Sequence, residues 1–69
     1  MDTRQLVATN LRRFRNAKGL SQEELAHRAG VDRSYVSLLE KGTYSPTVTM
    51  LAKLAAALDV KPGDFFEEV

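Results

Sequence analysis

Apolar residues recur at helical spacing along most of the chain. Val7, Leu11 and Phe14 follow one another at i, i+4 and i+7, which places them on one side of a helix spanning about 3–18. Residues 48–58 repeat the pattern, with an inner side formed by Leu51, Leu54, Ala55 and Leu58. No run shows the strict alternation of apolar and polar residues that predicts a strand, so the pattern predicts an all-α fold.

Two shorter helical patterns, over about 22–29 and 33–41, lie between these segments. Ser21 is the expected N-cap of the first, and Glu24 completes a capping box in which each side chain binds a backbone N–H group at the other's position. Asp32 is the expected N-cap of the second. The positions predicted to face inward are Leu25, Ala26, Ala29, Val36 and Leu39.

Glycine, proline and threonine mark the ends of the elements. The first three helices are each expected to end at a glycine: Gly19, in the left-handed conformation, then Gly30 and Gly42. Pro46 disfavours helix at the preceding residue, so the TYSP segment is a loop, and Thr47 caps the helix that follows. A last helix begins near Pro62, which suits a first helical turn because its missing N–H group is not needed there. The prediction is a compact bundle of five helices in a single domain over residues 1–69.

The composition narrows the class of protein. At 69 residues the chain is expected to form at most one domain, with a modest core. It has no cysteine, which excludes disulfides and cysteine-based metal sites, and its one histidine, His27, is expected on the surface of the 22–29 helix. No apolar run approaches the roughly 18 residues of a membrane span, and no secretory signal is visible. We therefore expect a cytoplasmic protein without a metal, a cofactor or a membrane partner.

The net charge of +1 is uninformative, but the charges are unevenly distributed. Residues 1–42 contain eight lysines and arginines against five acidic residues, whereas residues 43–69 contain two against four. A basic face of this kind is typical of proteins that bind nucleic acid. Ordinary scatter of surface charge gives the same asymmetry, and on charge alone it is the better explanation.

The spacing within the stretch LSQEELAHRAGVDRSYVSLLEKG is more specific than the charge. With Gln22 counted as position 1, the sequence has Ala26 at position 5, Gly30 at 9, Val31 at 10, Val36 at 15 and Leu39 at 18. The small residue lets two helices cross closely, the glycine adopts the positive φ of a tight turn, and the apolar residues fill the wedge between the helices. This constellation indicates a helix-turn-helix, in which the first helix braces a second that is too short to be stable alone. The second helix then projects toward a DNA major groove.

Over about residues 5–67 the sequence resembles the Cro/repressor-type (XRE, lambda-repressor-like) helix-turn-helix DNA-binding domains. The motifs that carry the resemblance are LRRFRNAKGLSQEELA, AGVDRSYVSLLEKG, SPTVTMLAKLAAALDV and KPGDFF. The resemblance implies a lambda-repressor-like bundle and a sequence-specific transcriptional regulator, a repressor or controller protein, that binds double-stranded DNA as a homodimer. It does not distinguish a stand-alone phage or restriction–modification regulator from the DNA-binding part of a longer repressor.

The inward pair Val36 and Leu39 leaves the opposite side of the second helix of the motif facing out. The resemblance implies that the N-terminal part of this helix reads bases, and the matching residues are Arg33, Ser34, Ser37 and Leu38. Arg33 is suited to bind guanine O6 and N7 together, whereas the serines specify weakly. Leu38 either touches a thymine methyl group or lies at a half-buried edge.

Contacts to the DNA backbone are expected around this helix. The start of the first helix of the motif is the family's phosphate clamp, and Gln22 fits that role or braces a base-reading side chain. The other predicted phosphate contacts are Arg12, Arg13, Lys18, Lys41, Thr43, Tyr44 and Ser45. Tyr35 is expected to pack on the 22–29 helix, with a phosphate contact as the alternative. Phosphate contacts position a protein on DNA without reading its sequence.

Two further pairs of residues have predicted roles in assembly. By resemblance, Arg15 and Glu40 form a partly buried salt bridge, rather than two solvated charges, between the first helix and the end of the third. Phe65 and Phe66 cannot both be buried in so small a bundle, so one is expected to close the core and the other to lie at the interface of a symmetric homodimer. The second helices of the two motifs, which would read the DNA, would lie about 34 Å apart in that dimer.

A protein–protein interaction module and an enzyme are the two alternatives to a DNA-binding protein. Some domains of this architecture are coactivators or antitoxin components, so the alternative is a protein–protein interaction module. An enzyme is not expected, because there is no nucleophile–base pair, glycine-rich phosphate loop or metal spacing, and because Glu23 and Glu24 point to different faces of a helix. No small-molecule effector is expected, since no sensor domain is recognisable.

Overall fold

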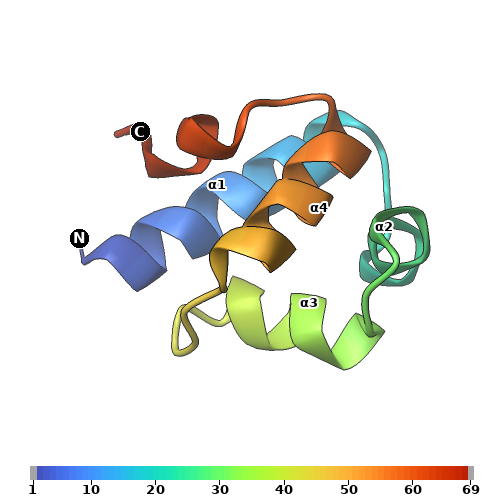
Figure 1. Cartoon of the computed structure of the whole chain (residues 1–69), viewed down its shortest axis with the longest axis horizontal. Coiled ribbons are helices and arrows are strands. Elements are labelled where there is room, and N and C mark those ends of the chain that lie inside the picture. The colour runs from blue at the N-terminus through green and yellow to red at the C-terminus, as the bar shows by residue number, and fades with distance from the viewer. Residues whose placement is uncertain (1, 69) are drawn as a thin grey trace.

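The computed structural model describes residues 2–68 and consists of four α-helices followed by a 3-10 helix (Figure 1). The elements are α1 (Thr3–Ala17), α2 (Gln22–Ala29), α3 (Arg33–Glu40), α4 (Val48–Leu58) and η1 (Pro62–Phe66). No residue among 2–68 lies in a β-strand, which confirms the all-α class for this part of the chain. The four α-helices agree with the predicted ranges to within one residue at each end.

The prediction of a fifth α-helix is wrong, because the last element is a 3-10 helix. Its backbone bonds span three residues, from the Asp64 N–H group to the Lys61 carbonyl (2.9 Å) and from the Glu67 N–H group to the Asp64 carbonyl (3.3 Å). Pro62 occupies the first turn as expected. A segment of five residues offers few i-to-i+4 bonds, and the tighter 3-10 geometry is common in such short pieces.

Asn10 on α1 holds this C-terminal segment in place. Its buried side-chain Nδ2 donates to the carbonyl oxygens of Phe65 (2.7 Å) and Glu67 (2.9 Å). Phe65 is fully buried and packs edge-to-face on Phe14, with ring centroids 5.6 Å apart, whereas Phe66 is 45% exposed. Phe65 is therefore the residue that closes the core. Because Phe65 has no free surface, Phe66 is the member of the pair that remains a candidate for the dimer interface.

Each α-helix begins at a side chain that accepts a backbone hydrogen bond. Ser21 Oγ accepts from the Glu24 N–H group (3.0 Å) and Glu24 Oε1 accepts from the Ser21 N–H group (2.9 Å), so the predicted capping box is confirmed. Asp32 and Thr47 cap α3 and α4 as predicted, and Asp2 caps α1. These bonds satisfy N–H groups that have no acceptor within the helix, which is why short local signals predict the helix starts.

The apolar core is formed by residues from every element. Its buried members are Val7, Leu11, Leu20, Leu25, Ala26, Ala29, Val36, Leu39, Leu51, Leu54, Ala55, Leu58 and Phe65. All five inward positions predicted for the α2–α3 pair are among them. Helix α2 contacts both α3 and α4, and α1 contacts both α3 and η1. In Figure 1, α3 lies at the lower edge of the bundle, on the side opposite the C-terminal segment.

The turn between α2 and α3 depends on Gly30. This residue has a φ of 70°, and directly after it the Val31 N–H group donates to the Ala26 carbonyl (3.0 Å). A left-handed backbone costs residues with a Cβ atom about 1–2 kcal/mol, and glycine avoids this cost. The predicted role of Gly30 is confirmed, and the turn sets α3 at an angle to α2.

Candidate nucleic-acid interface

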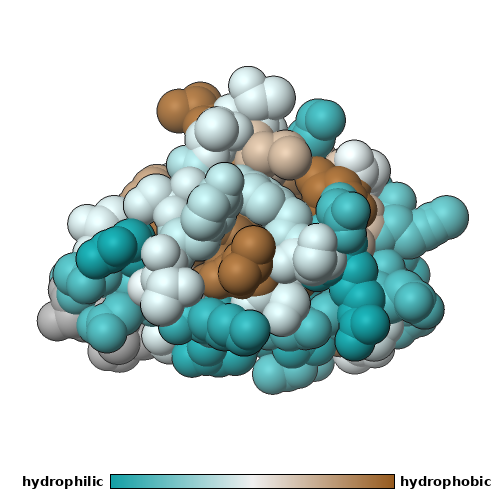
Figure 2. All heavy atoms as spheres, turned by 90° about the horizontal axis from the view of Figure 1, so that it is seen from below, coloured by the Kyte–Doolittle hydropathy of each residue, from teal (hydrophilic) through white to brown (hydrophobic). Residues whose placement is uncertain are grey.

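Helix α3 presents one predominantly polar side to solvent. Val36 and Leu39 are fully buried, and the residues on the opposite side are Arg33, Ser34, Ser37, Leu38 and Lys41. Figure 2 shows this side of the molecule as largely polar, with an apolar spot near its centre. Leu38, the exposed large apolar residue of α3, is 42% exposed. The structure thus brings the four residues predicted to read bases onto one surface, and Arg33, Ser34 and Ser37 line a single shallow depression.

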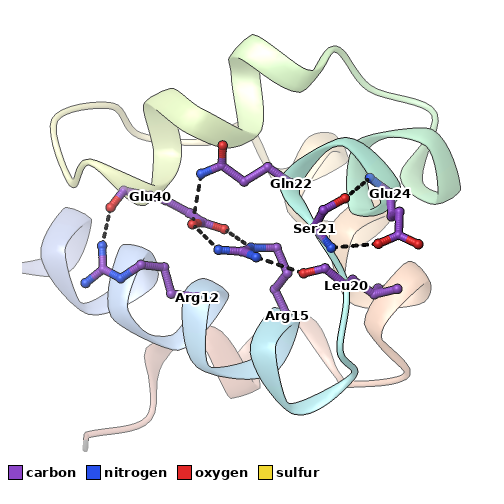
Figure 3. Close-up of polar contacts among 7 residues, drawn as sticks. All are labelled: Arg12, Arg15, Leu20, Ser21, Gln22, Glu24 and Glu40. Carbon is purple, nitrogen blue, oxygen red and sulfur yellow. Dashed lines mark hydrogen bonds and ion pairs between the residues drawn. The ribbon is translucent and has the colours of Figure 1, made fainter.

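A buried polar network centred on Glu40 lies behind this surface (Figure 3). The Glu40 side chain is 4% exposed, and its carboxylate accepts from Arg15 Nε (2.7 Å) and Nη2 (2.9 Å) and from Gln22 Nε2 (3.1 Å). Arg15 also donates to the Leu20 carbonyl (2.8 Å), and Arg12 donates to the backbone carbonyl of Glu40. The hydrogen bond to Glu40 raises the pKa of Arg15. The ion pair implied by the resemblance is present, and one carboxylate joins α1, the start of α2 and the end of α3.

A shallow groove separates the start of α2 from the start of α3. Its lining residues are Arg15, Ser21, Gln22, Glu23 and Arg33. The first-turn N–H groups of a helix have no acceptor within the helix, and they add positive potential to that of the two guanidinium groups. Glu40 compensates the charge of Arg15, and Glu23 adds a carboxylate to the lining, so Arg33 and the start of α2 are what this groove offers to an anion. Because Gln22 Nε2 donates to Glu40, the Gln22 side chain has only part of its donor capacity left for a phosphate.

Tyr35 is turned away from the outer surface. Its ring packs against the core and stands edge-to-face to Tyr44, with centroids 5.6 Å apart. The hydroxyl group is buried and has no hydrogen-bond partner within residues 2–68. Burial raises the pKa of Tyr35, although the backbone of Thr47 lies close enough to oppose the shift in part. The alternative of a phosphate contact is therefore wrong in this conformation, and Tyr35 instead supports the loop that carries Tyr44.

Two of the predicted phosphate contacts are engaged elsewhere. Arg13 Nη2 donates to Asn10 Oδ1 (2.9 Å), and its guanidinium lies 4.9 Å from the centroid of the Phe14 ring. Lys18 Nζ pairs with Asp59 at the end of α4 (2.9 Å). These partners belong to the side of the bundle that holds the C-terminal segment, so the structure does not bring Arg13 and Lys18 together with α3. Neither residue is therefore placed to contact a phosphate beside α3.

The loop after α3 keeps its predicted residues accessible. Lys41, Thr43, Tyr44 and Ser45 are all exposed, and Tyr44 is 47% exposed despite its contact with Tyr35. Arg12 reaches the end of α3 from α1 through the Glu40 carbonyl. These residues surround the C-terminal end of α3, whereas the groove lies at its N-terminal end.

Asp32, which was expected only as a helix cap, is also a residue of this surface. Its Oδ1 accepts from the backbone N–H group (3.0 Å) and from the hydroxyl group (2.9 Å) of Ser34. These bonds, the backbone bond first, lower the pKa of Asp32, so the exposed carboxylate is ionised at neutral pH. The sequence signal was an acidic residue directly before Arg33, but the capping role already accounted for it.

A second surface is apolar and lies away from α3. Residues from three segments line this groove: Thr3, Arg4, Val7, Ser45, Pro46, Val48, Leu51 and Phe66. Val48 is 87% exposed and Phe66 is 45% exposed. The sequence pointed to Phe66, but Val48 joins it only because the fold brings the start of α4 beside the same groove as the start of α1 and the C-terminal segment. We call this surface the Phe66 groove.

Within residues 2–68, no group of three or more histidine, cysteine, aspartate or glutamate side chains is placed to hold a metal ion. None of the helices described for this part of the chain has the length and apolar character needed to cross a membrane.

Comparison with known proteins finds a matching family, similar sequences and similar folds. The helix-turn-helix family (HTH_3) matches residues 11–65. The chain is 50% identical over 60 residues to the uncharacterized HTH-type transcriptional regulator y4dJ of Sinorhizobium fredii, which covers 87% of this chain and 78% of that protein. The fold of this chain is similar to that of the restriction-modification controller protein C.AhdI from Aeromonas hydrophila, with a TM-score of 0.87 and 44% sequence identity. The match covers 91% of this chain and 96% of that one. The N-terminal DNA binding domain of SinR from Bacillus subtilis also has a TM-score of 0.87, with 34% identity and coverage of 93% and 94%.

Proposed function

The chain belongs to the helix-turn-helix family, and on this premise we propose that it is a transcriptional regulator that binds a specific sequence of double-stranded DNA through α3. The observation that carries the proposal is the polar side of α3, held rigidly over buried Val36, Leu39 and the Glu40 network. A helix braced in this way can enter a major groove without rearranging. The names of the similar proteins, a transcriptional regulator and a restriction-modification controller, support a role as a repressor or controller.

Base reading is assigned to the exposed side of α3. Arg33 would bind guanine O6 and N7 together, a contact that contributes about 1–3 kcal/mol of discrimination. Ser34 and Ser37 lie in the same depression as Arg33, within reach of neighbouring base edges. Leu38 is 42% exposed, and this exposure favours contact with a thymine methyl group rather than the alternative of a half-buried edge.

Phosphate contacts are assigned to the two ends of α3. At its start, one DNA strand would follow the groove beside Gln22, where Arg33 and the N-terminus of α2 attract a phosphate. At its end, the other strand would meet the exposed residues Arg12, Lys41, Thr43, Tyr44 and Ser45. Binding should therefore weaken as the salt concentration rises.

We also assign the chain to a symmetric homodimer formed through the Phe66 groove. A single exposed apolar side chain is ordinary, but Val48 and Phe66 line one groove with Val7 and Leu51. A two-fold axis through this surface would present two copies of α3 to half-sites about 34 Å apart. The same groove also suits a different protein, and for that reason a protein–protein interaction module is the second candidate function.

The test is to select binding sites from a random DNA library and to titrate the best duplex and a scrambled duplex across a salt series. A two-fold related site bound at least about 10³-fold more tightly than the scrambled duplex is the expected result. Arg33→Ala should abolish this preference. Arg28→Ala is the matched control, because Arg28 is exposed on α2 and its charge acts on Asp59, at the end of α4. Weak, unselective binding that disappears with salt would refute the proposal and favour the interaction module.

A further inference from the structure

Asp32 is an exposed carboxylate at the start of the helix to which we assign base reading, directly before Arg33. Phosphates repel a carboxylate, so an acidic residue here opposes DNA binding unless a specific donor compensates for it. Helix capping does not require the charge, because serine, threonine and asparagine are comparable N-caps. The same chain uses Ser21 and Thr47 to cap α2 and α4.

The hydrogen bonds of Asp32 also determine what Ser34 can offer to DNA. The Ser34 hydroxyl donates its one proton to Asp32 Oδ1 (2.9 Å), so its lone pairs are left for other partners. The second carboxylate oxygen, Oδ2, accepts no hydrogen bond from any residue among 2–68. Asp32 and Ser34 therefore present only acceptors, while Arg33 between them presents only donors.

We propose that Asp32, with Ser34, accepts a hydrogen bond from the N4 amino group of a cytosine, and that Asp32 is a specificity-determining residue of the DNA surface. This inference rests on the proposed function. Cytosine offers a donor in the major groove, whereas guanine offers the two acceptors that suit Arg33. Adenine N6 is also a donor, but it lies beside the acceptor N7, which would face the oxygens of Asp32 and Ser34. The alternation of acceptor and donor along the start of α3 thus matches G·C pairs.

The experiment compares the wild-type chain with Asp32→Asn and Asp32→Ser, both of which keep a good N-cap. After site selection, each cytosine of the best duplex is replaced in turn by 2-pyrimidinone, a cytosine analogue that lacks the N4 amino group. At one cytosine of each half-site, the replacement should weaken wild-type binding about 5- to 150-fold. Asp32→Asn and Asp32→Ser should lose this sensitivity, keep the preferences at other positions and melt at the wild-type temperature. Ser34→Ala should lose the sensitivity in part.

Two results would overturn the inference alone. In the first, the wild-type chain selects a site in which no cytosine is sensitive to the analogue. In the second, Asp32→Asn binds every duplex more tightly by one common factor and still discriminates against the analogue, which would reduce Asp32 to a general repulsive charge. A wild-type chain that selects no sequence at all would overturn the proposed function, and this inference with it.

Discussion

Removal of the Glu40 carboxylate should loosen α3 and weaken every contact that depends on its position. In Glu40→Ala, Arg15 keeps its bond to the Leu20 carbonyl but loses both bonds to the carboxylate, and Gln22 loses its acceptor. The bond from Arg12 to the backbone carbonyl at position 40 does not involve the removed side chain. The variant therefore tests the carboxylate itself and leaves the end of the helix capped.

The expected magnitude follows from the burial of the pair. Breaking a fully buried ion pair costs about 3–5 kcal/mol, because the remaining charge is left uncompensated. The Arg15 side chain is 15% exposed and that of Glu40 is 4% exposed, so water partly solvates the orphaned guanidinium. We expect a loss of about 2–4 kcal/mol in the free energy of unfolding. For a chain of 69 residues this is a large share of a total of roughly 3–10 kcal/mol and lowers the melting temperature by at least about 10 °C.

Urea denaturation followed by circular dichroism measures this loss, and Arg15→Ala with the double variant completes a double-mutant cycle. If the orphaned guanidinium is the main cost, the double variant should be more stable than Glu40→Ala. Affinities for the selected and the scrambled duplex should fall together, because the whole of α3 loses its support. A Glu40→Ala protein with an unchanged melting temperature and unchanged DNA affinity would refute this reasoning.

Three other side chains carry separate predictions. Tyr35→Phe removes a buried hydroxyl group that has no hydrogen-bond partner among residues 2–68, so the free energy of unfolding in urea should stay the same or rise by up to about 1 kcal/mol. A decrease in the free energy of unfolding would instead show that the hydroxyl group is hydrogen-bonded in solution. Asp59 adopts a left-handed φ of 57°, so Asp59→Gly should raise the melting temperature by a few degrees, even though it removes an exposed pair with Lys18. A lower melting temperature would mean that the ion pair outweighs the backbone strain. The backbone N–H group of Ser21 is the main cause that lowers the pKa of Glu24 in the folded chain. The Glu24 carboxylate therefore stabilises the fold at any pH above its ordinary pKa of 4.5, and this contribution is lost as the pH falls through the lower pKa of the folded state. Between pH 7 and pH 3, unfolding of Glu24→Gln should accordingly depend less on pH than that of the wild-type chain, and identical profiles would contradict the assignment.

The helices and the turn of the motif were predictable from the sequence because their causes are local. Ser21, Asp32 and Thr47 each bond a backbone group two or three residues away, so their roles can be recognised from a short window. The same holds for Gly30, whose left-handed conformation permits the turn. Helical spacing likewise separates the buried side of α3 from its exposed side, which is why the candidate base-reading residues were identified without a structure.

Only the tertiary structure decided which residues each long or aromatic side chain contacts. Phe65 is buried and Phe66 is not because Asn10, 55 residues away in the sequence, binds the Phe65 carbonyl and holds the segment against α1. Arg13 and Lys18 carry the same charge as Arg12, yet packing directs them to the opposite side of the bundle. These choices depend on distances between elements that are remote in sequence, and periodicity or composition contains no information about such distances. The sequence by itself determined the elements and the exposed side of α3, whereas packing determined which charges and rings share that surface.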